Sequence, residues 1–287
     1  MTDGRTQRRG LLGALRDVVR AAYETYRLAG RMVVAAPLLL LVAVLPELLQ
    51  HAAEIHLGMF DSVNRFRALS ADPLRWSFGY LKVAGFVVAI LACARFWAVG
   101  SIRRTLLIPP AALIRIVAGL VVGFAVAWPF TWLNTQGIAP AINVPLQILS
   151  AVIQGAFLVY IVGALLEEKA VAPVRAMTSL LPAAVILTLL AALAFAPAQA
   201  LHMANHKLAL GQPTPIVWFL MIFDALWVGL FAALVGSALF VGVRTGLTWR
   251  GWTVPPGELG RSHAVMMSPA DNLAGMRRRA AAGSQMA

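Results

Sequence analysis

Long apolar stretches alternate with short polar segments along this chain. Six stretches each hold about 20 mostly apolar residues, the length that an α-helix needs to cross the hydrocarbon core of a bilayer. They cover residues 32–50, 78–98, 111–133, 144–166, 178–200 and 215–243. Transmembrane strands would show alternating polar and apolar positions over about ten residues, and these stretches do not alternate in that way. The sequence therefore predicts an all-α fold, a polytopic membrane bundle of six transmembrane helices.

Residues 11–28 have a different pattern. Apolar side chains recur there at helical spacing, while Arg16, Arg20 and Arg27 lie elsewhere on the helical wheel. This arrangement is typical of a helix that lies in the bilayer interface with its arginines on anionic headgroups. We therefore expect an N-terminal amphipathic interfacial helix. A cytoplasmic helix that packs on the loops of the bundle is the alternative.

The composition agrees with a membrane protein and indicates its orientation. Charged residues make up 13% of the chain, whereas soluble domains carry about 25%. The net charge of +12 raises the question of a nucleic-acid partner, but the placement of the basic residues explains the charge better. With six spans, about nineteen of the 24 Lys and Arg residues fall on the side that holds both termini, and cytoplasmic loops are the ones enriched in these residues. We expect both termini in the cytoplasm, a bacterial inner-membrane location and no nucleic-acid partner.

The same reasoning predicts three regions. Residues 1–31 form a cytoplasmic segment with the amphipathic helix, and residues 32–245 form the transmembrane domain. Residues 246–287 are rich in Pro, Gly and polar residues, and we expect a largely disordered cytoplasmic tail. The expected partners are the lipid bilayer, anionic headgroups on the cytoplasmic side, and either another membrane protein or a second copy of the chain.

An Arg-bearing segment precedes the first, third and fifth apolar stretches. The three segments read ALRDVVRAAYETYRLAGR, SIRRTLLIPPAALIR and EEKAVAPVRAMTSLLP, and an out-and-back helical hairpin follows each. Over residues 10–245 this arrangement resembles a group of bacterial six-helix inner-membrane proteins related to the membrane domain of some glycerophosphoryl diester phosphodiesterases. The resemblance lies in architecture and transfers no catalytic residue. It implies an accessory membrane role.

Histidines and acids gather near the end of the first stretch and before the last. Glu47, His51 and Glu54 share one face of a helix at i, i+4 and i+7, and His202 and His206 form an HxxxH pair. Imidazoles together with carboxylates suit Zn²⁺ and related divalent ions. These five residues are candidate metal ligands on the outer face, although no cofactor is required by the sequence. The alternative is that they are solvated, or that Glu47 and His51 form an ion pair.

Asp224 lies about nine residues into the last apolar stretch. A carboxylate at the centre of a bilayer costs about 2.5–3.5 kcal/mol on insertion scales, so it must face the bundle, a cavity or a partner. One interpretation is a proton or cation path with Gln154 and Lys82. The others are an ion pair with a buried cation such as Lys82 and a structural hydrogen bond to Gln154 or another polar group.

The chain lacks a Walker A loop, a GxSxG elbow and an HExxH motif. These absences favour a non-enzymatic accessory, scaffold or envelope-homeostasis protein of the membrane. The first alternative is a small transporter or channel that uses Asp224. The second is a membrane-embedded, metal-dependent enzyme that uses the His and Glu residues of the outer face.

Overall fold

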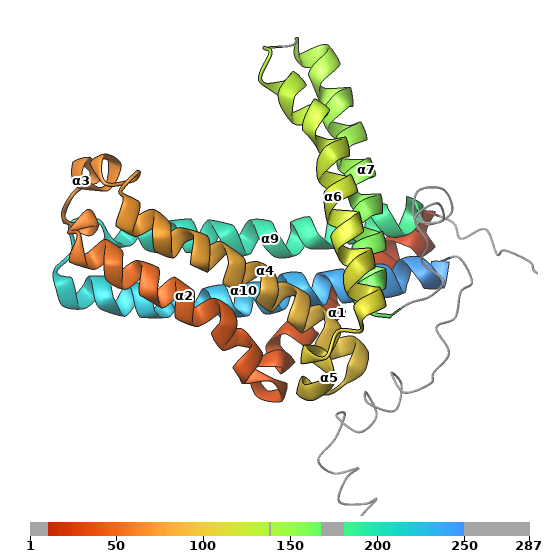
Figure 1. Cartoon of the computed structure of the whole chain (residues 1–287), viewed down its shortest axis with the longest axis horizontal. Coiled ribbons are helices and arrows are strands. Elements are labelled where there is room, and N and C mark those ends of the chain that lie inside the picture. The colour runs from red at the N-terminus through yellow and green to blue at the C-terminus, as the bar shows by residue number, and fades with distance from the viewer. Residues whose placement is uncertain (1–10, 138, 168–180, 250–287) are drawn as a thin grey trace, which may run out of the picture.

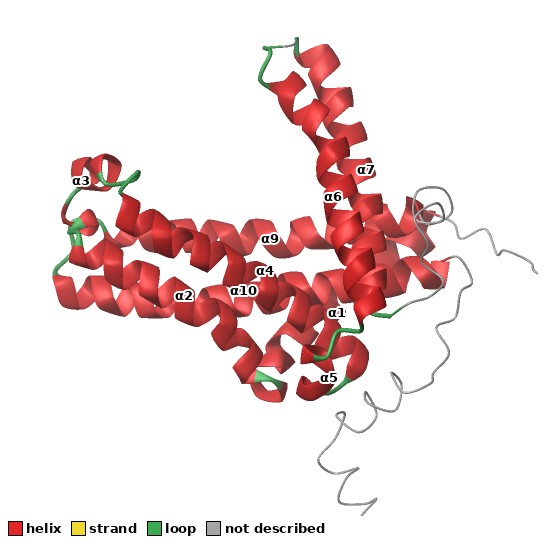
Figure 2. Ribbon diagram, in the orientation of Figure 1, coloured by secondary structure: helices red, strands yellow, loops and turns green. Residues whose placement is uncertain are grey.

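The computed structural model describes residues 11–137, 139–167 and 181–249. Within them the chain forms helices joined by short loops, and no strand is found in these ranges (Figure 2). The helices are α1 (Leu11–Ala35), α2 (Pro37–His56), the 3₁₀ turn η1 (Met59–Asp61), α3 (Val63–Ala68), α4 (Pro73–Val99), α5 (Ile102–Leu106), α6 (Pro110–Asn134), α7 (Pro140–Leu165), α9 (Leu181–Ala209) and α10 (Thr214–Trp249) (Figure 1).

The prediction of an all-α protein with six candidate spans is confirmed. Six described helices are long and apolar enough to cross a membrane: α2, α4, α6, α7, α9 and α10. The first span begins later than predicted, at Pro37 instead of residue 32, because α1 continues to Ala35. Ala36 leaves the helical region, with φ −152° and ψ 58°, as a residue before proline tends to do. α9 runs beyond the predicted residue 200 to Ala209.

α10 is the central helix of the bundle. It has 36 residues, a length of about 54 Å, and it contacts α1, α2, α4 and α9. Small residues allow the close approaches: a Cβ atom on Gly236 would lie 2.6 Å from the carbonyl oxygen of Ile90 on α4. Close approach through small residues is the usual way in which membrane helices pack, since lipid provides no hydrophobic force between them.

At one end of the bundle, α2 and α9 finish while α4 and α10 begin, next to η1 and α3 (Figure 1). The amide of Gly211 donates to the carbonyl of Phe60 at 2.8 Å and ties the loop before α10 to η1. This end brings the polar residues of α2, α4, α9 and α10 together.

α1 lies along the C-terminal half of α10. Leu28 and Met32 are buried in the core that it shares with the bundle, while Leu12, Leu15 and Val19 are exposed. The predicted amphipathic helix is therefore present, but it packs on the helices of the bundle as well as exposing apolar side chains. Its location in a bilayer interface stays a prediction.

α6 and α7 form a hairpin that leaves the rest of the bundle at a steep angle (Figure 1). The C-terminal part of α7 packs against α9, and Gly155 on α7 faces Thr188 and the backbone of Ala184 on α9. Phe124 and Trp128 are among the many large apolar side chains that the hairpin exposes. Such a surface needs lipid or protein to cover it.

Arg95 joins the segments at the other end of α4. Its side chain is 2% exposed, and its guanidinium donates to the carbonyls of Leu165 at 2.6 Å and Leu107 at 2.9 Å and to the carboxylate of Glu167 at 2.6 Å. The end of α7 and the segment after α5 are thereby linked to α4.

The predicted region boundaries fall inside helices. α1 crosses the boundary between residues 31 and 32, and α10 extends beyond residue 245 to Trp249. Residues 1–10 of the predicted N-terminal segment and residues 250–287 of the predicted tail lie outside the described residues.

Candidate metal centre

A group of buried polar side chains lies where α2, α4, α9 and α10 meet. We call it the buried polar cluster. Its buried members are Glu47, Gln50, His51 and Glu54 of α2, His202, Asn205 and His206 of α9, and Asp224 of α10, and the half-buried Arg75 and Lys82 of α4 join them at its edge. Isolated charges are rare and costly within apolar helices, so a group of this size needs a physical reason.

Helical spacing explains how each helix contributes. Glu47, His51 and Glu54 are all fully buried on the face of α2 that meets α10, as the i, i+4, i+7 pattern predicts. His202 and His206 lie within α9, because this helix continues to Ala209, and they face the same place one turn apart. Asp224 is also fully buried. The His and Glu groups and the lone aspartate, which lie far apart in the sequence, therefore belong to one cluster.

His51 is surrounded by carboxylates. Its Nδ1 lies 3.1 Å from Glu54, and its Nε2 lies 3.1 Å from Glu47 and 3.1 Å from Asp224. Two states satisfy this geometry. An imidazolium ring donates from both nitrogens. A neutral ring donates from Nδ1 to Glu54 and directs the Nε2 lone pair at a cation between Glu47 and Asp224.

Asp224 accepts from several sides. Its Oδ2 lies 2.6 Å from Nδ1 of His202, and its Oδ1 accepts from the amide of Asn205 at 2.8 Å. Nε2 of His202 lies 3.4 Å from Nζ of Lys82, which only donates, so the proton of a neutral His202 belongs on Nδ1. His202 therefore donates to Asp224 and holds its carboxylate in place.

Two buried members have unused hydrogen-bonding capacity. Neither ring nitrogen of His206 has a hydrogen-bond partner among the described residues, and Nε2 lies 3.7 Å from Oδ2 of Asp224. The carboxylate of Glu47 also lacks a well-aligned hydrogen bond there, although Nζ of Lys82 lies 2.7 Å from Oε1 as an ion pair. A buried polar group without a partner costs about 1–3 kcal/mol, so these atoms are suited to a ligand.

Glu47, His51, His206 and Asp224 form a set of ligand atoms that lie within 4.8 Å of one another. In a tetrahedral site with bonds of about 2.0–2.1 Å, neighbouring ligand atoms are about 3.3–3.4 Å apart. Nε2 of His51 lies 3.1 Å from Oε1 of Glu47 and 3.1 Å from Oδ2 of Asp224, and Oδ2 of Asp224 lies 3.7 Å from Nε2 of His206. Two imidazole nitrogens and two carboxylate oxygens at this spacing suit Zn²⁺ and related divalent ions.

Glu54 and His202, both predicted as ligands, have other positions. Glu54 lies against Nδ1 of His51 and is itself held by Gln50 at 3.1 Å and by Arg75 at 2.9 Å. A carboxylate that accepts the second N–H of a ligating histidine fixes the orientation of the ring and makes it a stronger ligand. Glu54 and His202 thus support the four-residue set from outside it.

The charges of the cluster do not cancel when the histidines are neutral. Glu47, Glu54 and Asp224 carry three negative charges, while Arg75 and Lys82 carry two positive ones. One further positive charge is needed to reach neutrality. A protonated His51 supplies this one charge, whereas a divalent cation supplies two and leaves the cluster with a net charge of +1.

The other predicted residues lie elsewhere or pair differently. Gln154, on α7, donates to Ser150 at 2.7 Å and makes no contact with Asp224. Lys82 pairs with Glu47 and not with Asp224. The two suggested partners of Asp224, Lys82 and Gln154, are therefore replaced by the histidines and Asn205. The sequence offered no signal for Asn205, because a single asparagine beside an HxxxH pair is unremarkable.

The predicted lipid-contact arginines all lie on α1. Arg16 and Arg20 are exposed. Arg27 makes a two-pronged ion pair with Glu24, at 2.8 and 2.6 Å, and this hydrogen bonding holds the pKa of Arg27 above its usual value. The charge of Arg27 is therefore paired within α1, whereas Arg20 lines a cavity between α1 and α10.

Comparisons with protein-family models, with curated proteins and with solved structures found no match for this chain. The architectural resemblance to bacterial six-helix membrane proteins stays a prediction, and the buried polar cluster itself is the basis for a function.

Proposed function

We propose that this chain is a non-enzymatic integral membrane protein whose bundle is held together by a divalent transition-metal ion, with Zn²⁺ as the first candidate. Glu47 and His51 of α2, His206 of α9 and Asp224 of α10 are its ligands. The observation that carries the proposal is the convergence of four ligand atoms within 4.8 Å, including a buried histidine with no hydrogen-bond partner in the described chain.

The number of ligands supports a structural role for the ion. Structural zinc sites have four protein ligands, whereas catalytic sites keep one position open for water or substrate. Four ligands from three helices close the coordination sphere and join α2, α9 and α10. A scaffold or accessory protein whose assembled state depends on metal is the function that this arrangement favours.

A direct test is the metal content of the purified protein. His206→Gln is the best variant, because His206 makes no hydrogen bond that the fold would lose. His56→Gln is the matched control, since His56 is exposed at the end of α2. After incubation with Zn²⁺ and gel filtration in detergent, we expect about one equivalent in the wild type and the control and much less in His206→Gln. Equal, near-zero metal in all three proteins refutes the proposal.

Cobalt provides a second readout of the geometry. Tetrahedral Co²⁺ with nitrogen and oxygen ligands absorbs visible light more strongly than octahedral Co²⁺, so substitution reports the coordination. We expect intense absorption in the wild type and its loss in His206→Gln. Weak absorption in a wild-type protein that retains Co²⁺ contradicts a closed four-ligand site.

The contact between Lys82 and Glu47 favours a second candidate function. If the ion pair at 2.7 Å persists in the presence of metal, His51, His206 and Asp224 remain as ligands with one position open. Two histidines and a carboxylate with an open position are the ligand set of zinc hydrolases. Glu47 is then placed as a general base beside a metal-bound water. Glu47→Gln separates the two functions, because it lowers metal content in the four-ligand site and leaves it unchanged in the three-ligand site.

A further inference from the structure

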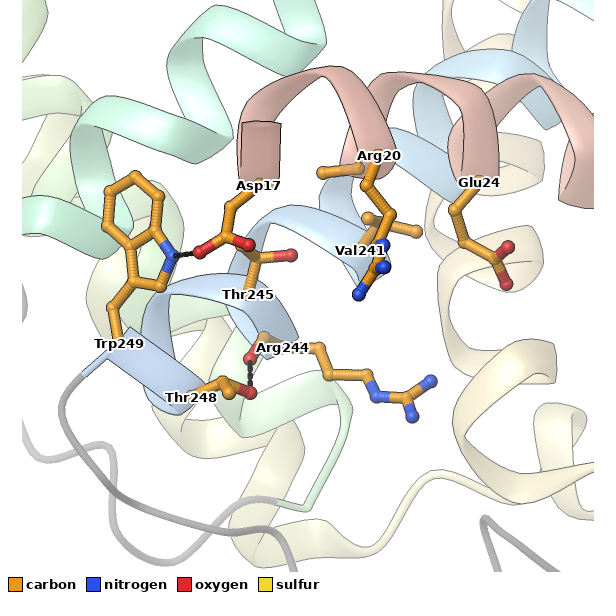
Figure 3. A pocket seen from close by; sticks show the side chains of 9 residues that line it. Asp17, Arg20, Glu24, Val241, Arg244, Thr245, Thr248 and Trp249 are labelled. Carbon is orange, nitrogen blue, oxygen red and sulfur yellow. Dashed lines mark hydrogen bonds between the residues drawn. The ribbon is translucent and has the colours of Figure 1, made fainter. Parts of the chain in front are cut away.

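A second polar feature lies between α1 and the C-terminal part of α10. A cavity of about 420 Å³ lies there. Figure 3 shows the side chains that line it, among them Asp17, Arg20 and Glu24 from α1 and Arg244, Thr248 and Trp249 from α10. Arg244 lies twenty residues after Asp224, or about 30 Å along the helix. The cavity is therefore separate from the buried polar cluster, and its chemistry does not depend on the metal.

The two carboxylates of the cavity already have partners. Asp17 accepts a hydrogen bond from Nε1 of Trp249 at 3.0 Å (Figure 3). Glu24 holds Arg27 through two contacts at 2.8 and 2.6 Å. Arg27 cancels the charge of Glu24, and Asp17 is engaged by Trp249.

The two arginines have no such partner. Within the described residues, no acidic side chain pairs with Arg20 or Arg244, and no hydrogen bond engages either guanidinium. Both arginine side chains line the cavity, Arg20 from α1 and Arg244 from α10 (Figure 3). Guanidinium groups match the geometry of phosphate oxygens and form paired, charge-assisted hydrogen bonds with them. The cavity therefore has the charge and the donors that an anionic phosphate group needs.

The surroundings of the cavity suit the interface of a membrane. Leu12, Leu15 and Val19, in the same half of α1, are exposed apolar side chains. An amphipathic helix places such residues at the boundary between headgroups and acyl chains. Trp249 lies at the end of α10, and tryptophan is enriched at that depth. A phosphate in the cavity would thus lie beside the acyl chains that contact α1.

We propose that this cavity binds a phosphate group, held between Arg20 of α1 and Arg244 of α10. The phosphate comes either from the headgroup of an anionic phospholipid or from a soluble phosphate. Binding joins α1 to α10 across the cavity and stabilises the packing of the amphipathic helix on the bundle.

The test uses the full chain in neutral detergent and its thermal unfolding midpoint. The probes are dioctanoyl phosphatidate, dioctanoyl phosphatidylcholine and inorganic phosphate. The variant Arg20→Gln/Arg244→Gln removes both donors, and Arg16→Gln/Arg103→Gln is the control with the same change of charge at exposed positions outside the cavity. We expect phosphatidate to raise the midpoint of the wild type and the control, and its apparent affinity to fall at least tenfold in Arg20→Gln/Arg244→Gln.

The probes distinguish the two sources of phosphate. A rise with phosphatidate alone supports a lipid headgroup, and a rise with both phosphatidate and inorganic phosphate supports a site for the phosphate group itself. Equal stabilisation of the wild type and Arg20→Gln/Arg244→Gln overturns the proposal, as does stabilisation by phosphatidylcholine equal to that by phosphatidate. If the double variant does not fold, Arg244→Gln alone is the test, because Arg244 is exposed and contributes little to the core.

Discussion

Asp224→Asn retains the size of the side chain at the centre of the buried polar cluster but replaces one acceptor oxygen with a donor group. In the structure Oδ2 faces Nδ1 of His202 at 2.6 Å and Oδ1 accepts from Asn205 at 2.8 Å. In the orientation that keeps the hydrogen bond from Asn205, the new NH₂ group faces the donor Nδ1 of His202. One charge-assisted hydrogen bond is lost and a buried group is left without a partner.

The expected cost follows from these contacts. A hydrogen bond to a charged group contributes about 1.5–3 kcal/mol, and removal of one partner of a buried ion pair costs about 3–5 kcal/mol. We expect Asp224→Asn to lower the free energy of unfolding by about 3–5 kcal/mol. In chains of 150–250 residues each kcal/mol corresponds to about 2–4 °C, so the unfolding midpoint should fall by about 6–20 °C.

Circular dichroism in detergent, with either EDTA or Zn²⁺ present, measures both effects of the substitution. A metal at a hundred times its dissociation constant stabilises the native state by about 2.7 kcal/mol, and only a protein with an intact ligand set should gain this. Asp61→Asn is the control at the same end of the bundle, where the exposed Asp61 pairs with Arg65 at 3.5 Å and such pairs contribute little.

The outcomes distinguish the hydrogen-bonded cluster from the metal site. A wild-type midpoint for Asp224→Asn in EDTA refutes the placement of Asp224 in a hydrogen-bonded cluster. If Asp224→Asn lowers the midpoint but Zn²⁺ has no effect on the wild type, the hydrogen-bonded cluster is supported and the metal site is refuted. In that case a protonated His51 supplies the missing positive charge.

Three other substitutions test particular contacts, and Gly30→Ala is the control for the last of them. Glu47→Gln should reduce bound Zn²⁺ at least tenfold, as measured by elemental analysis, and unchanged binding would show that only three side chains ligate the ion. Arg95→Met removes the buried guanidinium that holds three carbonyls and one carboxylate; it should cost about 3–5 kcal/mol and increase proteolysis, and wild-type resistance would contradict the role given to Arg95. Gly236→Ala places a Cβ 2.6 Å from the Ile90 carbonyl and should cost about 1–3 kcal/mol. Gly30→Ala, where a Cβ meets nothing within 4 Å, should be neutral or stabilising in the same unfolding assay.

Helix positions and residue spacing could be predicted from the sequence because they depend on local properties. A backbone hydrogen bond in a helix joins residues four apart, and the apolar length needed to span a bilayer is a property of one segment. The six spans, the amphipathic N-terminal helix and the shared face of Glu47, His51 and Glu54 follow from these rules. The sequence did not predict that α1 continues to Ala35, because the last turn of α1 is apolar and has the same composition as the start of the next span.

The composition of the cluster depended on contacts between distant segments. His51 and Asp224 are 173 positions apart. No local sequence pattern predicts that α2 and α10 pack side by side with these two residues at the same depth in the bundle. The same packing directs Glu54 at His51 and His202 at Asp224, and it leaves Gln154 outside the cluster on α7. It also places Arg244 across a cavity from Arg20. The sequence by itself determined which helices form and which polar residues they carry. Only the tertiary structure decided which of those residues meet, because the close packing of small residues along α10 sets the register between helices.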